Sequence, residues 1–349
     1  MQQITNYPPS SLGGGMKYRK LGKSGLDVSS ICVGAMSFGD LQRWPRPWLL
    51  NQDQSTEIVK HALDMGVNWF DTANMYDLGG SEEYLGEALK RLKPNREELV
   101  IQTKVSCKMA EGPNRQGNSR KEILNEIDVS LKRLQLDYVD VYILHRWDWN
   151  TPIEETMEAL NDVVKSGKAR YIGASAMFAW QFEKAYRIAE KNHWANFITM
   201  QNHLNLLYRE DEREMMPACE DAGVVCTPYS PLASGKLTDP WGTQTNRSLN
   251  DLQVQRKYAA TENVDRPIVE RVEKLAKERG VPMAQIAMAW LLHKSPVQAP
   301  ILGVTENFMI DDAIAATNLQ LSDEEIKYLE ELYVPHRVVG AVTKAGTMY

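Results

Sequence analysis

Four polar side chains in this sequence could together carry out proton-transfer chemistry. Asp71 closes the apolar run VNWFDTA, and Tyr76 follows five residues later. Lys104 and His145 lie at the ends of LVIQTKV and VDVYILH. A phenol has a pKa of about 10; a neighbouring ammonium lowers that pKa, and a carboxylate keeps a buried ammonium charged. Because His145 could orient a carbonyl oxygen, the set is suited to giving that oxygen a proton while its carbon gains another group.

Such residues need a scaffold that gathers the ends of separate strands. Short apolar runs rich in Val, Ile and Tyr alternate with longer amphipathic stretches, which is the pattern of strand–helix units. Eight such runs occur, at residues 29–36, 67–73, 99–105, 139–145, 169–175, 197–203, 223–230 and 299–304. Eight units in sequence predict an α/β fold, a closed (β/α)8 TIM barrel, in which chemistry lies at the carboxyl ends of the strands.

The main structural alternative is an open, doubly wound sheet. That fold would place G-x-G-x-x-G after its first strand. The segment ICVGAMSFGD does not supply the motif, because Gly34 and Gly39 are too far apart. The sequence therefore favours the barrel.

Further elements flank the predicted barrel. The segment KYRKLGKSGLDVSS, residues 17–30, predicts an N-terminal β-hairpin. Extra helices are predicted near the C-terminus, at 266–279 and 283–294. Thr151, directly before Pro152, predicts a helix N-cap.

Composition and charge narrow the class of protein. Residues 1–15 are rich in Pro, Ser and Gly and predict a flexible segment, which leaves residues 16–349 as a single barrel domain. The formal charge is −6, and no basic stripe favours nucleic acid. No apolar run is long enough to span a membrane. The four cysteines are scattered without a C-x-x-C pair, so we expect reduced thiols and a cytoplasmic location.

The predicted strands share one further property, which is a polar end. Their interiors are mostly apolar, whereas residues able to hydrogen-bond or titrate gather where the strands finish. That one-sided distribution predicts a catalytic face at one end of the barrel. The polar ends are Asp71, Lys104, His145, Ser175, Gln201, His203, Tyr229 and Ser230.

A family resemblance rests on long motifs in a fixed order. These are NWFDTANMY, LVIQTKV, YVDVYILHRWDWNTPIEETMEALNDVVKSGKARYIGASAM, QNHLN, YSPLASGKLT and PILGVT. From about residue 17 to 340 the chain resembles the aldo-keto reductase family. The resemblance implies a (β/α)8 barrel, reduction of an aldehyde or ketone by NADH or NADPH (or the reverse oxidation), and no metal. It also implies a catalytic tetrad with Tyr76 as the general acid, completed by Asp71, Lys104 and His145.

The resemblance further implies a set of cofactor contacts. Ser175 and Gln201 would bind the nicotinamide carboxamide, and Tyr229 would stack on the nicotinamide ring. A loop beginning at Ser230 would run along the pyrophosphate, with Lys236 available for charge. Its continuation through 237–247 would fold over the cofactor as a flap. The expected cofactor-binding residues are Met36, Asp71, Ser175, Gln201, Tyr229, Ser230, Leu232, Ser234, Lys236, Gly303, Thr305, Glu306 and Asp312.

Two departures from the family pattern bear on the cofactor. Ala176 stands where the family often has Asn as a second carboxamide partner. Glu306 stands where the family usually has Arg or Lys, which pairs with the 2′-phosphate of NADPH. A carboxylate repels a phosphate but can accept hydrogen bonds from free ribose hydroxyls. The family favours NADPH, whereas Glu306 moves the expectation modestly towards NADH or the use of both.

Tryptophans gather in the predicted strand-to-helix loops. A wide pocket with aromatic walls for a small carbonyl or alcohol substrate is the functional interpretation, and packing of the loops on the barrel is the structural one. Both stay open at this point. The expected pocket residues are Trp44, Trp48, Trp147 and Trp149.

Two other functions compete with a carbonyl reductase. A relative of this fold could act as a non-catalytic, nicotinamide-binding regulatory subunit, which the intact Tyr76 and His145 disfavour. A lyase could use Lys104 as a Schiff-base amine, which pairing with Asp71 disfavours. A plain buried ion pair is the structural alternative for Asp71 and Lys104. A homo-oligomer is compatible with all of these.

Overall fold

The eight predicted strands all form in the computed structural model, which describes residues 4–5, 16–244, 249–251 and 257–344. The strands are β4 (Cys32–Gly34), β5 (Trp69–Asp71), β6 (Val100–Val105), β7 (Val139–Leu144), β8 (Ala169–Ser175), β9 (Phe197–Gln201), β10 (Val225–Cys226) and β11 (Ile301–Gly303). Strand β8 spans the whole run that predicted it, whereas the other strands are shorter than their runs because the ladder pairs cover only part of each run.

The sheet is parallel and closes on itself. Its order is β10-β9-β8-β7-β6-β5-β4-β11. The two outer strands meet through a parallel bridge between Tyr229 and Ile301, where the Ile301 amide donates to the Pro228 carbonyl at 2.8 Å. Closure removes both sheet edges, as a barrel requires. The predicted (β/α)8 barrel is confirmed, and the doubly wound alternative is wrong.

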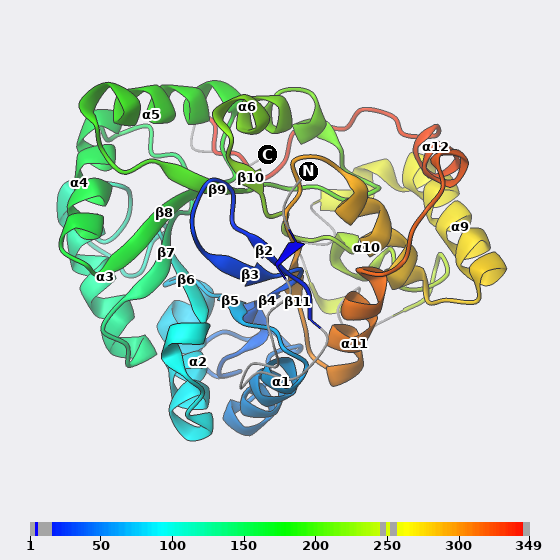
Figure 1. Cartoon of the computed structure of the whole chain (residues 1–349), viewed down its shortest axis with the longest axis horizontal. Helices are drawn as coiled ribbons and strands as arrows, with labels where there is room; N and C mark the ends of the chain where they lie inside the picture. The colour runs from blue at the N-terminus through cyan, green and yellow to red at the C-terminus, as the bar shows by residue number, and fades with distance from the viewer. Residues whose placement is uncertain (1–3, 6–15, 245–248, 252–256, 345–349) are drawn as a thin grey trace.

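Helices surround the barrel and extend it on one side (Figure 1). The two extra helices predicted near the C-terminus are present as α9 and α10. The helices are α1 (Gln52–Asp64), α2 (Gly80–Leu92), α3 (Arg120–Leu134), α4 (Ile153–Lys165), α5 (Ala179–Asn192), α6 (Met215–Ala222), α9 (Glu262–Arg279), α10 (Met283–His293), α11 (Asn307–Ala316) and α12 (Asp323–Glu330).

The predicted cap of α4 is wrong. Pro152 occupies the N-cap position, and no side chain caps the helix. The Thr151 hydroxyl instead donates to the Asp148 carboxylate at 2.7 Å. That carboxylate also accepts from the Asn118 amide at 2.9 Å, and this second bond joins the loop after β6 to the loop after β7.

Side chains on each strand alternate between two apolar cores. On β7, Val141 and Ile143 belong to a small cluster inside the barrel, whereas Tyr142 and Leu144 belong to a large cluster between sheet and helices. Successive side chains on a strand point to opposite faces. The residue after Leu144, which is His145, therefore continues the inward series at the carboxyl end.

A hairpin covers the amino end of the barrel, as predicted. Strands β2 (Tyr18–Lys20) and β3 (Asp27–Ser29) pair antiparallel. Leu21, between them, is fully buried in the inner cluster. The Tyr18 hydroxyl donates to the Gly66 carbonyl at 2.7 Å, directly before the second barrel strand. The hairpin lies across the sheet in Figure 1 and leaves the opposite end for chemistry.

Of the predicted flexible segment 1–15, the structure describes only two residues. Ile4 and Thr5 form strand β1, which pairs antiparallel with β2. The predicted flap, 237–247, is described up to residue 244, and its last three residues lie outside the described part of the chain.

The C-terminal segment crosses the carboxyl end of the barrel. The Val339 amide donates to the Tyr208 hydroxyl at 3.0 Å, and the Trp149 indole donates to the Val342 carbonyl at 2.8 Å. The segment therefore bridges loops that follow two different strands, and it is drawn in red in Figure 1.

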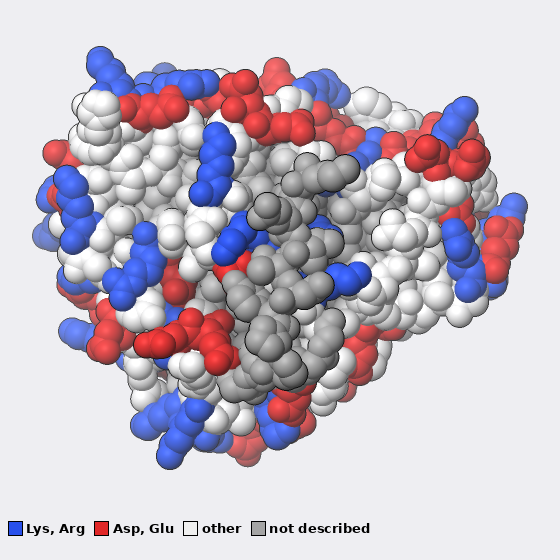
Figure 2. Space-filling model, viewed as in Figure 1, with Lys and Arg blue, Asp and Glu red and all other residues white. Residues whose placement is uncertain are grey.

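The surface carries both signs of charge. On the face viewed in Figure 2, Lys and Arg are interspersed with Asp and Glu among the described residues. None of the helices in the described ranges has the length and apolar character that crossing a bilayer would require.

Candidate active site

The barrel brings the predicted tetrad together at its carboxyl end. Asp71 pairs in register with Gln102 across β5 and β6, and Lys104 pairs with Ile143 across β6 and β7. The His145 amide donates to the Val105 carbonyl at 2.9 Å, which places His145 just beyond the ladder. Because these positions alternate with outward-facing residues, Asp71, Lys104 and His145 all face the barrel interior.

A buried ion pair lies at the centre of the site. The Lys104 Nζ is 2.6 Å from Asp71 Oδ2, and the two residues are 1% and 2% exposed. The same ammonium donates to the Thr72 carbonyl at 2.8 Å and to the Tyr76 hydroxyl at 3.2 Å. All three ammonium hydrogens therefore have acceptors, which is the condition under which a lysine stays charged in a dry interior.

The second oxygen of Asp71 is held by two amides. Gln102 Nε2 and Gln201 Nε2 each donate to Oδ1 at 2.8 Å. Sequence reasoning missed Gln102, although its position two residues before Lys104 puts both on the same strand face. Gln201 was expected at the nicotinamide carboxamide; its amide nitrogen is directed at Asp71.

The electrostatics of the site differ in one respect from the sequence expectation. Burial opposes the charge on Lys104, but Asp71 and Tyr76 outweigh it and raise the pKa of the ammonium. Burial also raises the pKa of the Tyr76 phenol, by more than Lys104 lowers it. The expected net fall in the phenol pKa is therefore wrong for this structure. Lys104 offsets part of the desolvation cost and does not reverse it.

His145 is a neutral imidazole. Burial, followed by the charges of Arg146 and Lys104, lowers its pKa well below the usual value. Its ring meets the Tyr76 ring edge to face, with centroids 5.9 Å apart. A neutral imidazole beside the phenol can donate a hydrogen bond to a carbonyl oxygen without competing for its proton.

A strained turn sets the position of Tyr76. Asp77 and Leu78, the next two residues, both have φ of 50°, a left-handed conformation that non-glycine residues seldom adopt. The buried Asp77 carboxylate accepts from the Asp40 amide at 2.9 Å. That bond ties the turn to the loop that follows β4, so the strain is balanced by tertiary contacts.

The expected nicotinamide contacts lie on neighbouring strand ends. Ser175 and Gln201 are register partners on β8 and β9. Tyr229 stacks on His203 at 5.1 Å and 7°, and His203 stacks in turn on Tyr208 at 4.2 Å. Sequence analysis pointed to Tyr229 and His203 but missed Tyr208, because nothing local marks it as the third ring. Burial raises the pKa of Tyr229 to about 12.

The expected pyrophosphate loop is irregular and partly exposed. Ser230, Ala233 and Ser234 have φ between 49° and 58°. The cation expected to serve it, Lys236, lies 3.6 Å from Glu262. Lys257, which sequence analysis missed, donates to the Ser230 hydroxyl at 3.4 Å.

The remaining cofactor positions follow two adjacent strands. Met36 lies in the 3-10 turn after β4. Thr305 and Glu306 follow β11, and Glu306 is the exposed N-cap residue of α11. The Asp312 carboxylate accepts from Gln285 at 2.7 Å and is therefore already engaged.

The tryptophans form two separate groups. Trp44 and Trp48 meet edge to face at 6.0 Å. Trp147, Trp149 and Trp180 contact one another with centroids 5.7 to 6.5 Å apart. Mutual packing therefore accounts for part of the aromatic clustering, as the structural interpretation required.

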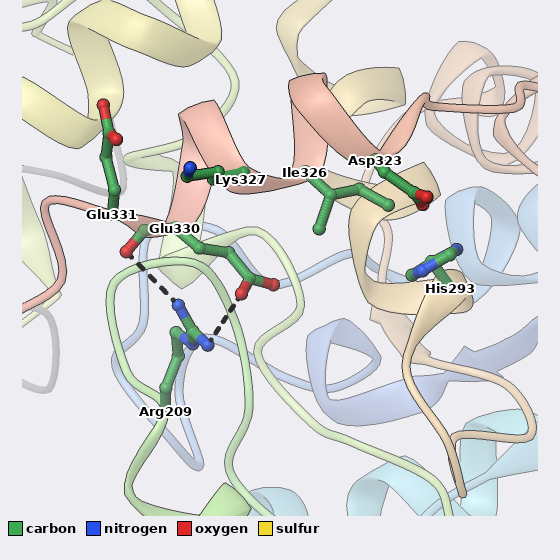
Figure 3. Close-up of a pocket in the computed structure, with 7 residues that line it drawn as sticks. All are labelled: Arg209, His293, Asp323, Ile326, Lys327, Glu330 and Glu331. Carbon is green, nitrogen blue, oxygen red and sulfur yellow. Dashed lines mark hydrogen bonds and ion pairs between the residues drawn. The ribbon is translucent and has the colours of Figure 1, made fainter.

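The hollows on the described surface include two that differ in their lining residues. A cavity of about 310 Å³ borders Tyr229 and Ala176 under the C-terminal segment. A second, of about 420 Å³, opens between α10 and α12. Arg209 in it pairs with Glu330 at 3.1 Å (Figure 3). The second hollow contains none of the predicted site residues. Within the described ranges, no cluster of His, Cys, Asp or Glu side chains could hold a metal ion.

Comparisons with known proteins define the family. The model of the Aldo/keto reductase family matches residues 30–334. The chain is 44% identical to the versiconal hemiacetal acetate reductase of Aspergillus parasiticus, over 93% of this chain and 98% of that protein. It is 42% identical to a Schizosaccharomyces pombe protein that carries the name aryl-alcohol dehydrogenase, over 93% and 98%. The chain belongs to the aldo/keto reductase family, which makes it an oxidoreductase.

Replacing Lys104 by Met should destabilise the fold, because it leaves Asp71 buried and unpaired. Losing one partner of a buried pair costs about 3–5 kcal/mol, which urea unfolding at neutral pH would measure. The double variant with Asp71→Asn serves as the control. It should recover part of the loss, since no uncompensated charge remains. If the free energy of unfolding of Lys104→Met is within about 1 kcal/mol of the wild-type value, Lys104 and Asp71 are not a buried ion pair.

Asp211, which borders the 310 Å³ cavity, should make stability depend on pH. Burial raises the pKa of Asp211 to about 7, whereas an unfolded-chain Asp titrates at about 4. The folded protein holds this proton more tightly, so the stabilisation is complete below the unfolded pKa and is lost as pH rises towards the folded one.

Asp211→Asn should therefore lose less stability than wild type as pH rises from about 4 to about 7 in urea unfolding. Glu214→Gln, a change at an exposed carboxylate of the same segment, is the control and should follow wild type. If Asp211→Asn and wild type lose the same stability over this pH range, the raised pKa of Asp211 is ruled out.

Proposed function

We propose that this protein is a nicotinamide-dependent carbonyl reductase, which reduces an aldehyde or ketone to an alcohol or catalyses the reverse oxidation. One observation carries the proposal. The Tyr76 hydroxyl lies 3.2 Å from Lys104, which is paired with Asp71 at 2.6 Å, beside the neutral imidazole of His145. A proton donor, a cation and a carbonyl-orienting group thus converge at one end of a barrel.

The roles of the residues follow from their protonation. The Tyr76 hydroxyl gives its proton to the carbonyl oxygen, and the ammonium of Lys104 stabilises the phenolate that remains. Asp71 keeps that ammonium charged and fixed in place. His145 donates a hydrogen bond to the same carbonyl oxygen and sets its direction. When bound, the nicotinamide cofactor supplies the hydride to the carbonyl carbon.

The residues around the tetrad suit a nicotinamide cofactor. Tyr229 follows β10 and pairs with Ile301 of β11, where its ring gives a planar ring an aromatic surface to stack on. Ser175 and Gln201, side by side on adjacent strands, offer hydroxyl and amide groups to a carboxamide. Lys257 brings a positive charge to Ser230 in the loop that would follow the pyrophosphate. The hydride acceptor would then lie beside Tyr76 at the barrel mouth.

An aromatic carbonyl compound is the substrate class that we propose. Two relatives carry names that refer to an aryl alcohol or to a versiconal derivative. Trp44, Trp48, Trp147 and Trp149 would provide apolar walls for such a ring system. A panel of aromatic and aliphatic carbonyls, run with NADH and NADPH, tests reaction class and substrate class together. Faster turnover of aliphatic substrates would overturn the substrate class only.

The alternative functions have less support. A non-catalytic cofactor-binding subunit would not need the proton donor, cation and imidazole to converge. A Schiff-base lyase would need Lys104 as a free amine, whereas the charge of Asp71 raises the pKa of Lys104 against burial. Steady-state turnover of a carbonyl substrate separates the reductase from the first alternative, and borohydride trapping separates it from the second.

Tyr76→Phe should abolish proton donation while cofactor binding stays close to wild type. The expected loss in kcat is at least the ~10²–10⁴-fold typical of a general acid. Tyr138→Phe is the control, because it removes a phenol hydroxyl from the start of β7, where Arg96 and Arg170 cover the ring. Turnover by Tyr76→Phe equal to wild type, with chemistry rate-limiting, would exclude Tyr76 as the acid.

Glu306 should set the choice between NADH and NADPH. A partly exposed carboxylate beside a 2′-phosphate costs on the order of 1 kcal/mol, or roughly tenfold in affinity. Wild type should bind NADH at least as well as NADPH. Glu306→Arg should tighten NADPH and leave NADH nearly unchanged, because only NADPH carries a phosphate for the guanidinium.

Fluorescence titration of both reduced cofactors into both proteins measures this choice. Glu158→Arg makes the same change of charge on the exposed face of α4 and should not move the ratio. A wild type that already prefers NADPH by about tenfold would refute the role of Glu306. The phosphate partner would then be another base, with Arg247, outside the described residues, as the sequence candidate.

A further inference from the structure

A cysteine lies directly against the imidazole of the site. Cys107 follows β6, three residues after Lys104. Its Sγ is 3.8 Å from Nδ1 of His145, within the range of a sulfur hydrogen bond. Cys107 is partly buried and His145 is 4% exposed. The proposed mechanism uses His145 but leaves this thiol without a role.

The protonation states of the two groups restrict what the contact can be. Burial raises the pKa of the Cys107 thiol, so sulfur keeps its hydrogen at neutral pH. Burial lowers the pKa of His145, so only one of its two ring nitrogens carries a hydrogen. Either Sγ–H donates to Nδ1 and the ring hydrogen lies on Nε2, or Nδ1–H donates to sulfur and Nε2 is bare.

The first arrangement is the one compatible with orienting a carbonyl. A carbonyl oxygen accepts hydrogen bonds, so the nitrogen that meets it must carry a hydrogen. Within the described ranges, the sulfur of Cys107 is the side-chain partner of Nδ1, and no carbonyl or carboxylate oxygen accepts from that nitrogen. In proteins the hydrogen bond made by one ring nitrogen decides which tautomer the other nitrogen presents.

We propose that Cys107 is a positioning residue that donates its Sγ–H to Nδ1 of His145 and so holds the imidazole hydrogen on Nε2, where it faces the substrate oxygen. This inference rests on the proposed carbonyl reduction. It gives Cys107 no part in hydride or proton transfer. The thiol acts through His145 and touches neither substrate nor cofactor in this role.

The tautomer itself can be measured without cofactor or substrate. In protein labelled with ¹⁵N-histidine, the shifts of the two ring nitrogens show which one is protonated. The chain has six histidines, and His145→Gln assigns the signals of His145 by their loss. Wild type should show a protonated Nε2 and a bare Nδ1. Cys107→Ala should show a mixture of the two tautomers, because the donor to Nδ1 is lost.

Steady-state kinetics provide a second test of the role of Cys107. A hydrogen bond of ordinary net strength corresponds to about two- to tenfold, so Cys107→Ala should lower kcat by that factor. KM should change less, because the bond aligns the carbonyl rather than adding a substrate contact. Cys219→Ala, a buried cysteine of α6, is the control for loss of a thiol and should match wild type in tautomer and kcat.

Two results would overturn the inference. One is a wild-type protein with the hydrogen on Nδ1, because the thiol would then be the acceptor. The other is Cys107→Ala with an unchanged tautomer and unchanged kcat. The activities of Tyr76→Phe and His145→Gln test the proposed function independently of Cys107. If both variants remain fully active, the proposed carbonyl reduction through this site is wrong. If both are inactive while Cys107→Ala keeps the wild-type tautomer and kcat, only the inference about Cys107 is wrong.

Discussion

The ion pair between Lys104 and Asp71 is the interaction on which the arrangement of the site depends. Taking two charges out of water costs several kcal/mol for each ion, and their attraction repays this only when the remaining hydrogen-bonding groups are satisfied. Here Gln102 and Gln201 hold the second carboxylate oxygen, while the Thr72 carbonyl and the Tyr76 hydroxyl accept from the ammonium. Together with the ion pair itself, these groups come from three strands, β5, β6 and β9, and from the loop after β5. A closed barrel gathers them because it brings the ends of distant strands to one place.

Burial has opposite effects on different groups of the site. It strengthens the hold of Asp71 on Lys104 and keeps His145 neutral, but it raises the pKa of Tyr76 above that of a phenol in water. The phenol therefore stays protonated in the resting protein and is ready to give its proton. Lys104 acts mainly on the product of that step, the phenolate, whose charge it stabilises. Lys104 therefore stabilises the state formed during proton transfer more than it stabilises the resting protein.

Local patterns predicted the strands and the tetrad, whereas contacts between distant segments escaped them. The polar ends of the apolar runs identify Asp71, Lys104 and His145, and a closed barrel makes such ends neighbours. The stack of Tyr229, His203 and Tyr208 joins separate segments, and nothing local in the sequence marks Tyr208 as its third ring. Thr151 has the sequence of a cap but bonds to Asp148, because a carboxylate three residues earlier in the same loop competed with the helix end. The net direction of the Tyr76 pKa depends on burial, which no short motif encodes.

The hairpin at the amino end of the barrel gives the molecule two ends with different rates of exchange with solvent. Leu21 and Val28 seal one mouth, and the strand segments just inside it are fully enclosed. Water must therefore reach the barrel interior from the catalytic end. Amide hydrogens near the hairpin should be replaced by deuterium most slowly, because their exposure requires opening of the whole barrel. Those on the catalytic loops should be replaced fastest. The barrel thus has a gradient of local stability along its axis, with its most easily opened end where substrates must enter and products must leave.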